Sequence, residues 1–432
     1  MKLHAQAGKH RLATLVLDMF GSGQVAPAEA APAAAEGFDR SPWKQETFAA
    51  GPQPAARFAA AMGYDEDTGE TVLFGGADAG CDVMNDTWTW DGERWTDRTP
   101  ADPGDSPAPR QYGGMVYAGP GKGMLLFGGE NLDYADKTWL WDGTKWKDAT
   151  PADAGASKET EAGTYTGAGP ETRIDAGTDA GAGSNTLIDA GTGAGSEARA
   201  IANWMRSPSP RIQFAMAYIG NGEVLLYGGF GPGGALRDTW IWNGTGWRDA
   251  TPADPNDSPT SSHRTCMAYD RKNKQAVLFG GYTDAPPYLT NATWTWDGRK
   301  WTLRTPAASP SPRVFASMAY DAIGGKTILV GGEANYAPKQ DAWLWDGSNW
   351  TEQTASNPPD LSLAAMAYDT RRGQSVLFGG YDGSVLSANT WTQRIACAAN
   401  VNAPRPATAG HDAATRPKMA PGFGWITSRT RG

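Results

Sequence analysis

Short apolar runs along the chain each end in two glycines, and each is followed by a stretch in which aromatic and polar residues alternate. In the first copy, Val72-Leu73-Phe74 leads into Gly75-Gly76, and a tryptophan follows each such pair at 10 to 13 residues. The six pairs are Gly75-Gly76, Gly128-Gly129, Gly228-Gly229, Gly280-Gly281, Gly331-Gly332 and Gly379-Gly380, followed by Trp88, Trp139, Trp240, Trp294, Trp343 and Trp391. A repeat of this period predicts a fold made of equal units.

Each unit reads as four short β segments separated by turns. The continuous apolar run before the glycines suits a strand buried on both faces. Trp88 and Trp90 are two residues apart, so their indoles lie on one face of a strand. Asp91-Gly92 signals a tight turn, after which Trp95 begins a fourth strand. No window of similar length has a sustained helical period, so the chain is predicted to be all-β.

Four antiparallel strands per unit, repeated around a circle, make a six-bladed β-propeller. Closure of the circle removes the exposed sheet edges that an open array would present. The chain has 19 tryptophans, and 16 of them occupy the recurring Trp-x-Trp…Trp positions, which provides the aromatic mass to pack one blade on the next. Most tryptophans are therefore assigned to the scaffold.

The repeat resembles the kelch family, whose motif has apolar residues, Gly-Gly, a variable stretch, an aromatic residue, six residues and then Trp. The six-residue gap holds in five units, and the resemblance spans residues 40–395. The pairs with this gap are Trp88/Trp95, Trp139/Trp146, Trp240/Trp247, Trp294/Trp301 and Trp343/Trp350. The resemblance implies a propeller that binds a protein or a glycan without catalysis.

The sixth unit lacks its last tryptophan, and a matching segment occurs at the other end of the chain. Residues 42–48, with Trp43, resemble the stretch around Trp95, so we expect an N-terminal strand to complete the last blade. The propeller is then expected over residues 37–398. The Gly/Ala/Thr-rich residues 154–203 have little apolar mass and are interpreted as a low-complexity insert. A degenerate seventh blade is the alternative.

Composition narrows the class of partner. The net charge of −9 argues against nucleic acid and anionic membranes, and no apolar run reaches the ~20 residues of a transmembrane helix. Residues 1–36 combine an early positive charge, a short apolar stretch and an Ala/Pro spacer, which favours an export signal and a secreted or periplasmic protein; a cytoplasmic leader is the alternative. Residues 399–432 read as a flexible tail. We expect a monomer.

Catalytic chemistry is scarce in the sequence. The chain has four histidines, of which only His263 lies in the expected propeller. Galactose oxidase, a copper enzyme with a kelch propeller, needs paired His and Tyr ligands and a Tyr joined to a Cys, which one histidine cannot supply. No phosphate loop, zinc motif or nucleophile elbow is present. We therefore expect no catalytic residue, no metal and no cofactor.

Four arginines form the first candidate binding set. They stand five residues before the methionine of their inner strands, a placement predicted to bring them toward one mouth of the central channel: Arg57, Arg110, Arg211 and Arg313. Guanidinium groups there could hold a carboxylate or phosphate. This favours an alternative function, an enzyme for an acidic sugar similar to the kelch-type sialic acid mutarotases. The other interpretation is that each arginine pairs with an aspartate or a carbonyl and joins units together.

The second candidate set consists of aromatic residues in the loops between Gly-Gly and Trp. Its members are Tyr134, Phe230, Tyr282, Tyr288, Tyr336 and Tyr381. Loops on a rigid scaffold are the usual place for binding residues, and tyrosine suits contacts to proteins or sugars. The set predicts a binding face for protein or carbohydrate; scattered surface aromatics, and a structural repeat without a ligand, are the alternatives.

Overall fold

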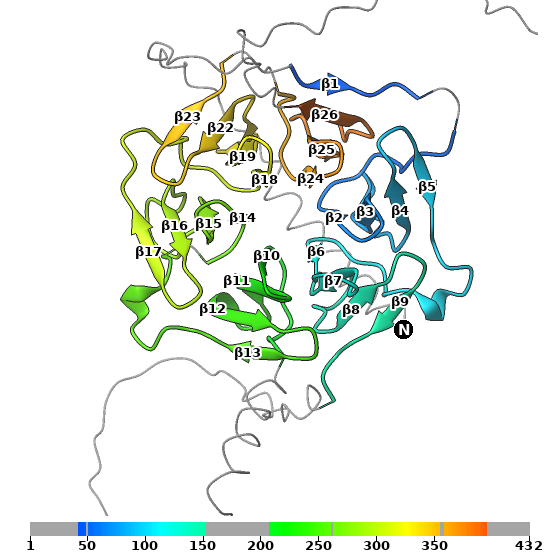
Figure 1. Cartoon of the computed structure of the whole chain (residues 1–432), viewed down its shortest axis with the longest axis horizontal. Helices are drawn as coiled ribbons and strands as arrows, with labels where there is room; N and C mark the ends of the chain where they lie inside the picture. Colours follow the sequence, from blue (N-terminus) through cyan, green and yellow to red (C-terminus); the bar gives the residue numbers. More distant parts are fainter. Residues whose placement is uncertain (1–41, 49–50, 153–206, 261, 355–357, 395–432) are drawn as a thin grey trace, which may run out of the picture. The chain divides into compact units, whose positions relative to one another are not determined.

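The computed structural model describes residues 42–48, 51–152, 207–260, 262–354 and 358–394. Within these residues six four-stranded antiparallel sheets surround a central channel, so the predicted six-bladed β-propeller is confirmed (Figure 1). The expected leader (1–36), insert (154–203) and tail (399–432) lie outside the described residues.

The first three blades follow the chain directly, from the innermost strand outward. Blade 1 holds β2 (Ala61–Asp65), β3 (Glu70–Phe74), β4 (Thr87–Trp90) and β5 (Trp95–Asp97). Blade 2 holds β6 (Gly114–Tyr117), β7 (Met124–Phe127), β8 (Thr138–Trp141) and β9 (Trp146–Asp148). Blade 3 holds β10 (Ala215–Gly220), β11 (Glu223–Gly231), β12 (Gly234–Trp242) and β13 (Trp247–Asp249).

Blades 4 and 5 repeat this order. Blade 4 holds β14 (Cys266–Asp270), β15 (Gln275–Phe279), β16 (Thr293–Trp296) and β17 (Trp301–Arg304). Blade 5 holds β18 (Ser317–Asp321), β19 (Lys326–Val330), β22 (Ala342–Trp345) and β23 (Trp350–Glu352), with the small hairpin β20 (Glu333–Ala334) and β21 (Ala337–Pro338) in its loop. Short 3-10 turns, η1 (Pro103–Asp105) and η2 (Pro255–Asp257), follow blades 1 and 3.

Blade 6 joins the two ends of the propeller. It holds β24 (Ala365–Asp369), β25 (Gln374–Phe378) and β26 (Thr390–Arg394), and its outer strand is β1 (Lys44–Gln45). β1 pairs antiparallel with β26, with Lys44 opposite Thr392 and Gln45 opposite Trp391 (Figure 1). The predicted closure by an N-terminal strand is therefore confirmed.

Each Gly-Gly pair sits at a junction between blades. Gly75 has φ +64°, and a Cβ there would lie 2.5 Å from the carbonyl oxygen of Arg110, in the segment that leads into the next blade. The amide of Gly76 donates to that same carbonyl over 2.9 Å. The other five pairs repeat this contact, so a side chain at the first glycine would push two blades apart.

The last tryptophan of five blades is hydrogen bonded across a junction. Its Nε1–H donates over 2.8–2.9 Å to a threonine on the third strand of the preceding blade. The pairs are Trp95–Thr390, Trp146–Thr87, Trp247–Thr138, Trp301–Thr239 and Trp350–Thr293. Six clusters of the apolar core correspondingly lie at the junctions between neighbouring blades, and a seventh lies on the side of the Gly-Gly loops.

Candidate functional site

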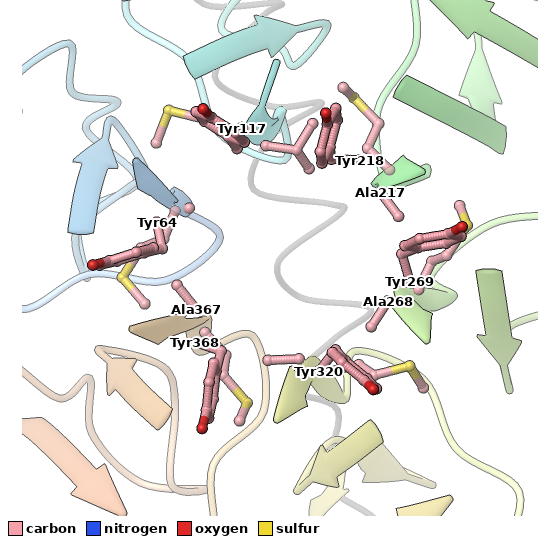
Figure 2. A pocket seen from close by; sticks show the side chains of 18 of the residues that line it. Tyr64, Tyr117, Ala217, Tyr218, Ala268, Tyr269, Tyr320, Ala367 and Tyr368 are labelled. Atoms are coloured by element: carbon pink, nitrogen blue, oxygen red, sulfur yellow. The ribbon is translucent and has the colours of Figure 1, made fainter. Parts of the chain in front are cut away.

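The central channel is lined by the six inner strands, each carrying the pattern Met-x-Tyr. The middle residue is small, as at Ala217, Ala268 and Ala367, and these side chains lie nearest the channel axis (Figure 2). The labelled tyrosines turn aside from the axis (Figure 2), and the methionines pack in the apolar clusters between neighbouring blades. The cavity they enclose has a volume of about 220 Å³.

The channel tyrosines act as ties between blades. The hydroxyl of Tyr117 donates to Asp67 of blade 1 over 3.0 Å, and that of Tyr368 donates to Asp321 of blade 5. Tyr320 accepts from the backbone amide of Lys272 in the β14–β15 turn. Burial and the adjacent carboxylate raise the pKa of Tyr117 and of Tyr368 well above the ordinary value. Both hydroxyl groups are therefore protonated at neutral pH and act as hydrogen-bond donors.

An ion pair spans one end of the channel, where the turns between the first and second strands of the blades lie. Arg271 of blade 4 contacts Glu66 of blade 1, and both residues line the cavity. The sequence separation of 205 residues reflects contact between blades that lie opposite one another in a ring of six.

The other end of the channel, on the side of the Gly-Gly loops, is closed by a ring of backbone hydrogen bonds. One residue per blade, three before the channel methionine, donates its amide to the carbonyl of its counterpart in the preceding blade, over 2.8–3.3 Å. All six adopt φ between +53° and +60°: Ala59, Tyr112, Gln213, Arg264, Phe315 and Leu363. None is a glycine, so the strained conformation is held by the closed ring around it.

The side chains of this ring enclose a pocket of about 180 Å³ at the loop-face mouth. The guanidinium of Arg264 lies over the rings of Phe315 and Tyr282, with its Cζ 5.1 and 5.6 Å from their centroids, and its Nε donates to Gln213 Oε1 over 3.3 Å. Thr265 completes the polar lining. Among the described residues, three buried polar atoms at or beside this mouth have no hydrogen-bond partner: Gln111 Oε1, Gln213 Nε2 and Thr265 Oγ1.

Two glutamates flank the pocket directly after Gly-Gly pairs. Burial raises the pKa of Glu130 to about 7, against a weaker lowering by the Gln111 side chain. Burial also raises the pKa of Glu333, although the Ser362 side chain and, more weakly, Arg264 oppose the shift. Between the blades, His263 packs on Phe230 and Tyr282 at 5.3 Å from each ring, and its Nδ1 lies 2.9 Å from Ser262 Oγ; burial and Arg264 lower its pKa to about 4.

The structure does not bring the four predicted arginines together at the channel mouth. All are buried, and none lines the channel cavity or the loop-face pocket. Each turns into its own blade and donates to the carbonyl of the first glycine: Arg57 to Gly75, Arg110 to Gly128, Arg211 to Gly228 and Arg313 to Gly331. These contacts fit the interpretation in which each arginine ties parts of the scaffold together.

Three of these arginines also form bidentate ion pairs with an aspartate that precedes Trp-x-Trp. The pairs are Arg57–Asp86, Arg211–Asp238 and Arg313–Asp341. In blade 2, Lys137 stands between Asp136 and Thr138, so the aspartate lies one residue further from Trp139 than in blades 1, 3 and 5. Arg110 therefore has no carboxylate within 4.0 Å among the described residues. Burial lowers the pKa of Arg110 to about 10. Blade 4 has Ser262 and Ala292 at the two positions, and blade 6 has Leu361 and Asn389, so arginine and aspartate are lost together.

The predicted loop aromatics do lie on one face, around the pocket. Tyr282 and Tyr288 stack at 5.7 Å and 14°, and Phe230 continues the row through His263. Tyr134 and Phe230 pack against the buried loop-face cluster around Tyr112. Tyr381 bridges Ser362 and Leu386 through its backbone, while Tyr336, with φ +64°, stands at the tip of the β20–β21 hairpin. Their role as ligand contacts stays a prediction.

Exposed apolar side chains also stand on the loops that follow the Gly-Gly pairs. Among the described residues, four of the six large exposed hydrophobics belong to loops after Gly-Gly pairs, with 47–62% of their surface exposed. These four residues, termed the crown below, are Leu132, Tyr288, Tyr336 and Val385. The other two are Leu303 on β17 and Ile323 in the β18–β19 turn.

Sequence reasoning missed Arg264, Gln213 and the two glutamates. Their positions in the repeat could have identified them. The ring residues stand three residues before each channel methionine, and the glutamates directly follow a Gly-Gly pair. What the spacing does not disclose is the left-handed backbone, which aims position −3 at the mouth and position −5 into the blade.

Comparison with protein-family models found no match. Three curated proteins match short stretches: Multiple epidermal growth factor-like domains protein 8 of Mus musculus (38% identity over 80 residues), tRNA wybutosine-synthesizing protein 4 of Emericella nidulans (39% over 82) and Dynein regulatory complex subunit 7 of Chlamydomonas reinhardtii (34% over 95). The matches cover 18–22% of this chain and 3%, 7% and 8% of those proteins. They establish local similarity and no shared activity.

The described residues contain neither a group of metal ligands nor a membrane-spanning helix. In that part of the chain, no three His, Cys, Asp or Glu side chains are grouped as metal ligands would be. No helix there has the length and apolar character required to span a membrane.

Proposed function

We propose that this chain is a kelch-type, non-enzymatic binding protein that holds a partner protein on its loop face. The observation that carries the proposal is the crown, because four of the six large exposed hydrophobic side chains of the described residues stand on the loops of one face, and loops on a rigid scaffold are the usual place for binding residues. The Gly-Gly junctions and Trp-x-Trp strands form a rigid scaffold beneath it, so the variable loops are free to carry recognition.

A glycan is the second candidate ligand. The stacked pair Tyr282 and Tyr288, at 5.7 Å, offers a flat aromatic surface beside polar groups, a combination that suits a sugar ring. The acidic-sugar enzyme finds less support, since the arginines on which it depended turn into the blades. The names of the three relatives indicate unrelated roles, so the similarity favours a shared structural unit over a shared reaction.

The test compares two sets of polar substitutions in pull-downs from the native host. The crown variant carries Leu132→Ser, Tyr288→Ser, Tyr336→Ser and Val385→Ser, and the matched control carries Leu303→Ser and Ile323→Ser, exposed to a similar degree elsewhere. We expect partner proteins to be retained by the wild type and the control and lost by the crown variant, with melting temperatures unchanged. Equal retention by all three would exclude the crown as the binding face.

A further inference from the structure

We propose that the loop-face pocket binds a carboxylate group, held by Arg264, Gln213 and Thr265. The proposal rests on the binding function above, because it names the chemistry that the same face recognises at its centre. The carboxylate has two sources, an acidic side chain of the partner protein or a free small acid, and the experiment separates them.

Arg264 differs from Arg57, Arg211 and Arg313 in having no acidic partner. Each of those three has a carboxylate within 4.0 Å, whereas Arg264 has none among the described residues. Arg110 also lacks one, but its guanidinium turns into the blade and donates to the Gly128 carbonyl. Its guanidinium is nevertheless fixed, because two aromatic rings stack on it and Nε donates to Gln213. Nη1 and Nη2 therefore present a preorganised fork, the geometry that matches a carboxylate in bidentate fashion.

The pocket supplies two further donors that the protein leaves unused. Gln213 is only 7% exposed, and its Nε2 has no hydrogen-bond partner. Because Oε1 already accepts from Arg264, Nε2 is the end of this amide that is left to donate. Thr265 Oγ1 is likewise buried without a partner in the same lining. Leaving a buried donor unsatisfied is unfavourable, and an acceptor bound in the pocket would relieve that cost.

In the described part of the chain, the flanking acids form no ion pair with Arg264. Glu333 is the carboxylate whose field acts on it, but burial outweighs Arg264 and leaves the pKa of Glu333 raised. Glu130, on the far side of Tyr112, has its pKa raised to about 7 by burial. His263 stays neutral, since its pKa is lowered to about 4. An incoming carboxylate consequently meets one cation, two donors and acids that hold protons more readily than usual.

The experiment follows the side-chain Nε–Hε signals of ¹⁵N-arginine-labelled full-length protein by NMR. The probes are sodium acetate and hexaglutamate, with acetamide and hexaglutamine as neutral controls. We expect saturable shifts of one signal, identified by its absence in Arg264→Gln, and at least tenfold weaker binding in Gln213→Glu, read from the same signal; in Arg264→Gln no other arginine signal should shift saturably. Glutamine already adopts the same left-handed conformation at Gln213, so Arg264→Gln should keep the fold. Arg299→Gln, which removes an exposed arginine of the β16–β17 turn, should bind as the wild type.

The outcomes separate this proposal from the proposed function. Saturation by acetate indicates a free small acid, and saturation by hexaglutamate alone indicates an acidic segment of a protein. Linear, unsaturable shifts, or unchanged affinity in Gln213→Glu, would overturn the carboxylate site even if the crown variant loses its partners. If the crown variant retains every partner while acetate still saturates Arg264, the protein-binding function fails and the carboxylate site stands.

Discussion

At the scale of single residues, one aspartate accepts hydrogen bonds from two other side chains in its blade. Asp86, Asp238 and Asp341 each accept both an arginine and the Nε1–H of the first tryptophan of Trp-x-Trp, over 2.6–2.8 Å for the indole. In blades 2 and 4, which lack an aspartate in this register, Trp139 and Trp294 keep a buried Nε1 without a partner. The aspartate that joins an arginine to the first tryptophan of Trp-x-Trp is therefore present in three of the six blades.

Removing such an aspartate should cost more than removing an exposed one. Arg211 has no exposed side-chain surface, so Asp238→Asn leaves a buried charge without its counter-ion. We expect the free energy of unfolding to fall by about 3 kcal/mol in urea titrations. The matched control is Asp284→Asn, which breaks the exposed pair Arg237–Asp284 and should cost less than about 1 kcal/mol. Equal effects of the two substitutions would contradict the scaffold role.

A second prediction at this scale concerns pH. The pKa of Glu130 is about 7 in the folded protein, above that of an unfolded glutamate, so the folded state binds the proton more tightly. Stability from this group is full below the ordinary glutamate pKa and is lost as pH rises toward 7 and beyond. Glu130→Gln should therefore raise the melting temperature at pH 8 and change it little at pH 4.5. An equal shift at both pH values would show that Glu130 carries no such cost.

At the scale of elements, the closing blade contains one defect in the tryptophan–threonine series. Trp43 stands before β1 where Trp95 stands in blade 1, and it is 94% buried, with 6% exposed. The position that is threonine in the other blades is Ala342 in blade 5, and both residues belong to the same core cluster. The Nε1 of Trp43 accordingly lacks a hydrogen-bond partner.

Ala342→Thr should repair that defect. The other five junctions accommodate threonine here, so the hydroxyl should accept from Trp43 and raise the free energy of unfolding by about 1 kcal/mol. Ala342→Val, which adds similar volume without a hydroxyl, is the control and should gain less. The two variants are compared by their urea midpoints; a valine equal to or better than threonine would show that packing, rather than the hydrogen bond, governs the position.

The elements that sequence predicted well are those governed by local rules. Val72-Leu73-Phe74 and Trp88-x-Trp90 announce strands because burial and alternation are written in adjacent residues. The direction of Arg57 was not predictable, since its partner Asp86 lies 29 residues away and meets it only after β3 has folded back. Arg264 was missed for a similar reason: its aim depends on a backbone ring closed by six separate blades.

At the scale of the whole molecule, stability depends on a closed circle. The backbone ring at the loop-face mouth, the Gly-Gly junctions and the β1–β26 pairing each pass through all six blades or complete the last one. The Glu66–Arg271 contact adds a strut between blades 1 and 4. Loss of one outer strand should thus be felt as loss of closure, because each blade buries its apolar face only against its neighbours.

Truncation to a chain beginning at residue 49 tests this directly. The deletion removes β1 and Trp43, exposing both the hydrogen-bonding edge of β26 and the apolar cluster formed with Ala342 and Leu361. Trp43→Ala keeps the strand and loses only the indole, for which we expect a cost of about 3–5 kcal/mol. The truncated chain should be less stable still, and should self-associate through its open edge, as seen by light scattering after size exclusion. A truncated protein that stays monomeric and melts with the wild type would mean that the ring does not need its N-terminal strand.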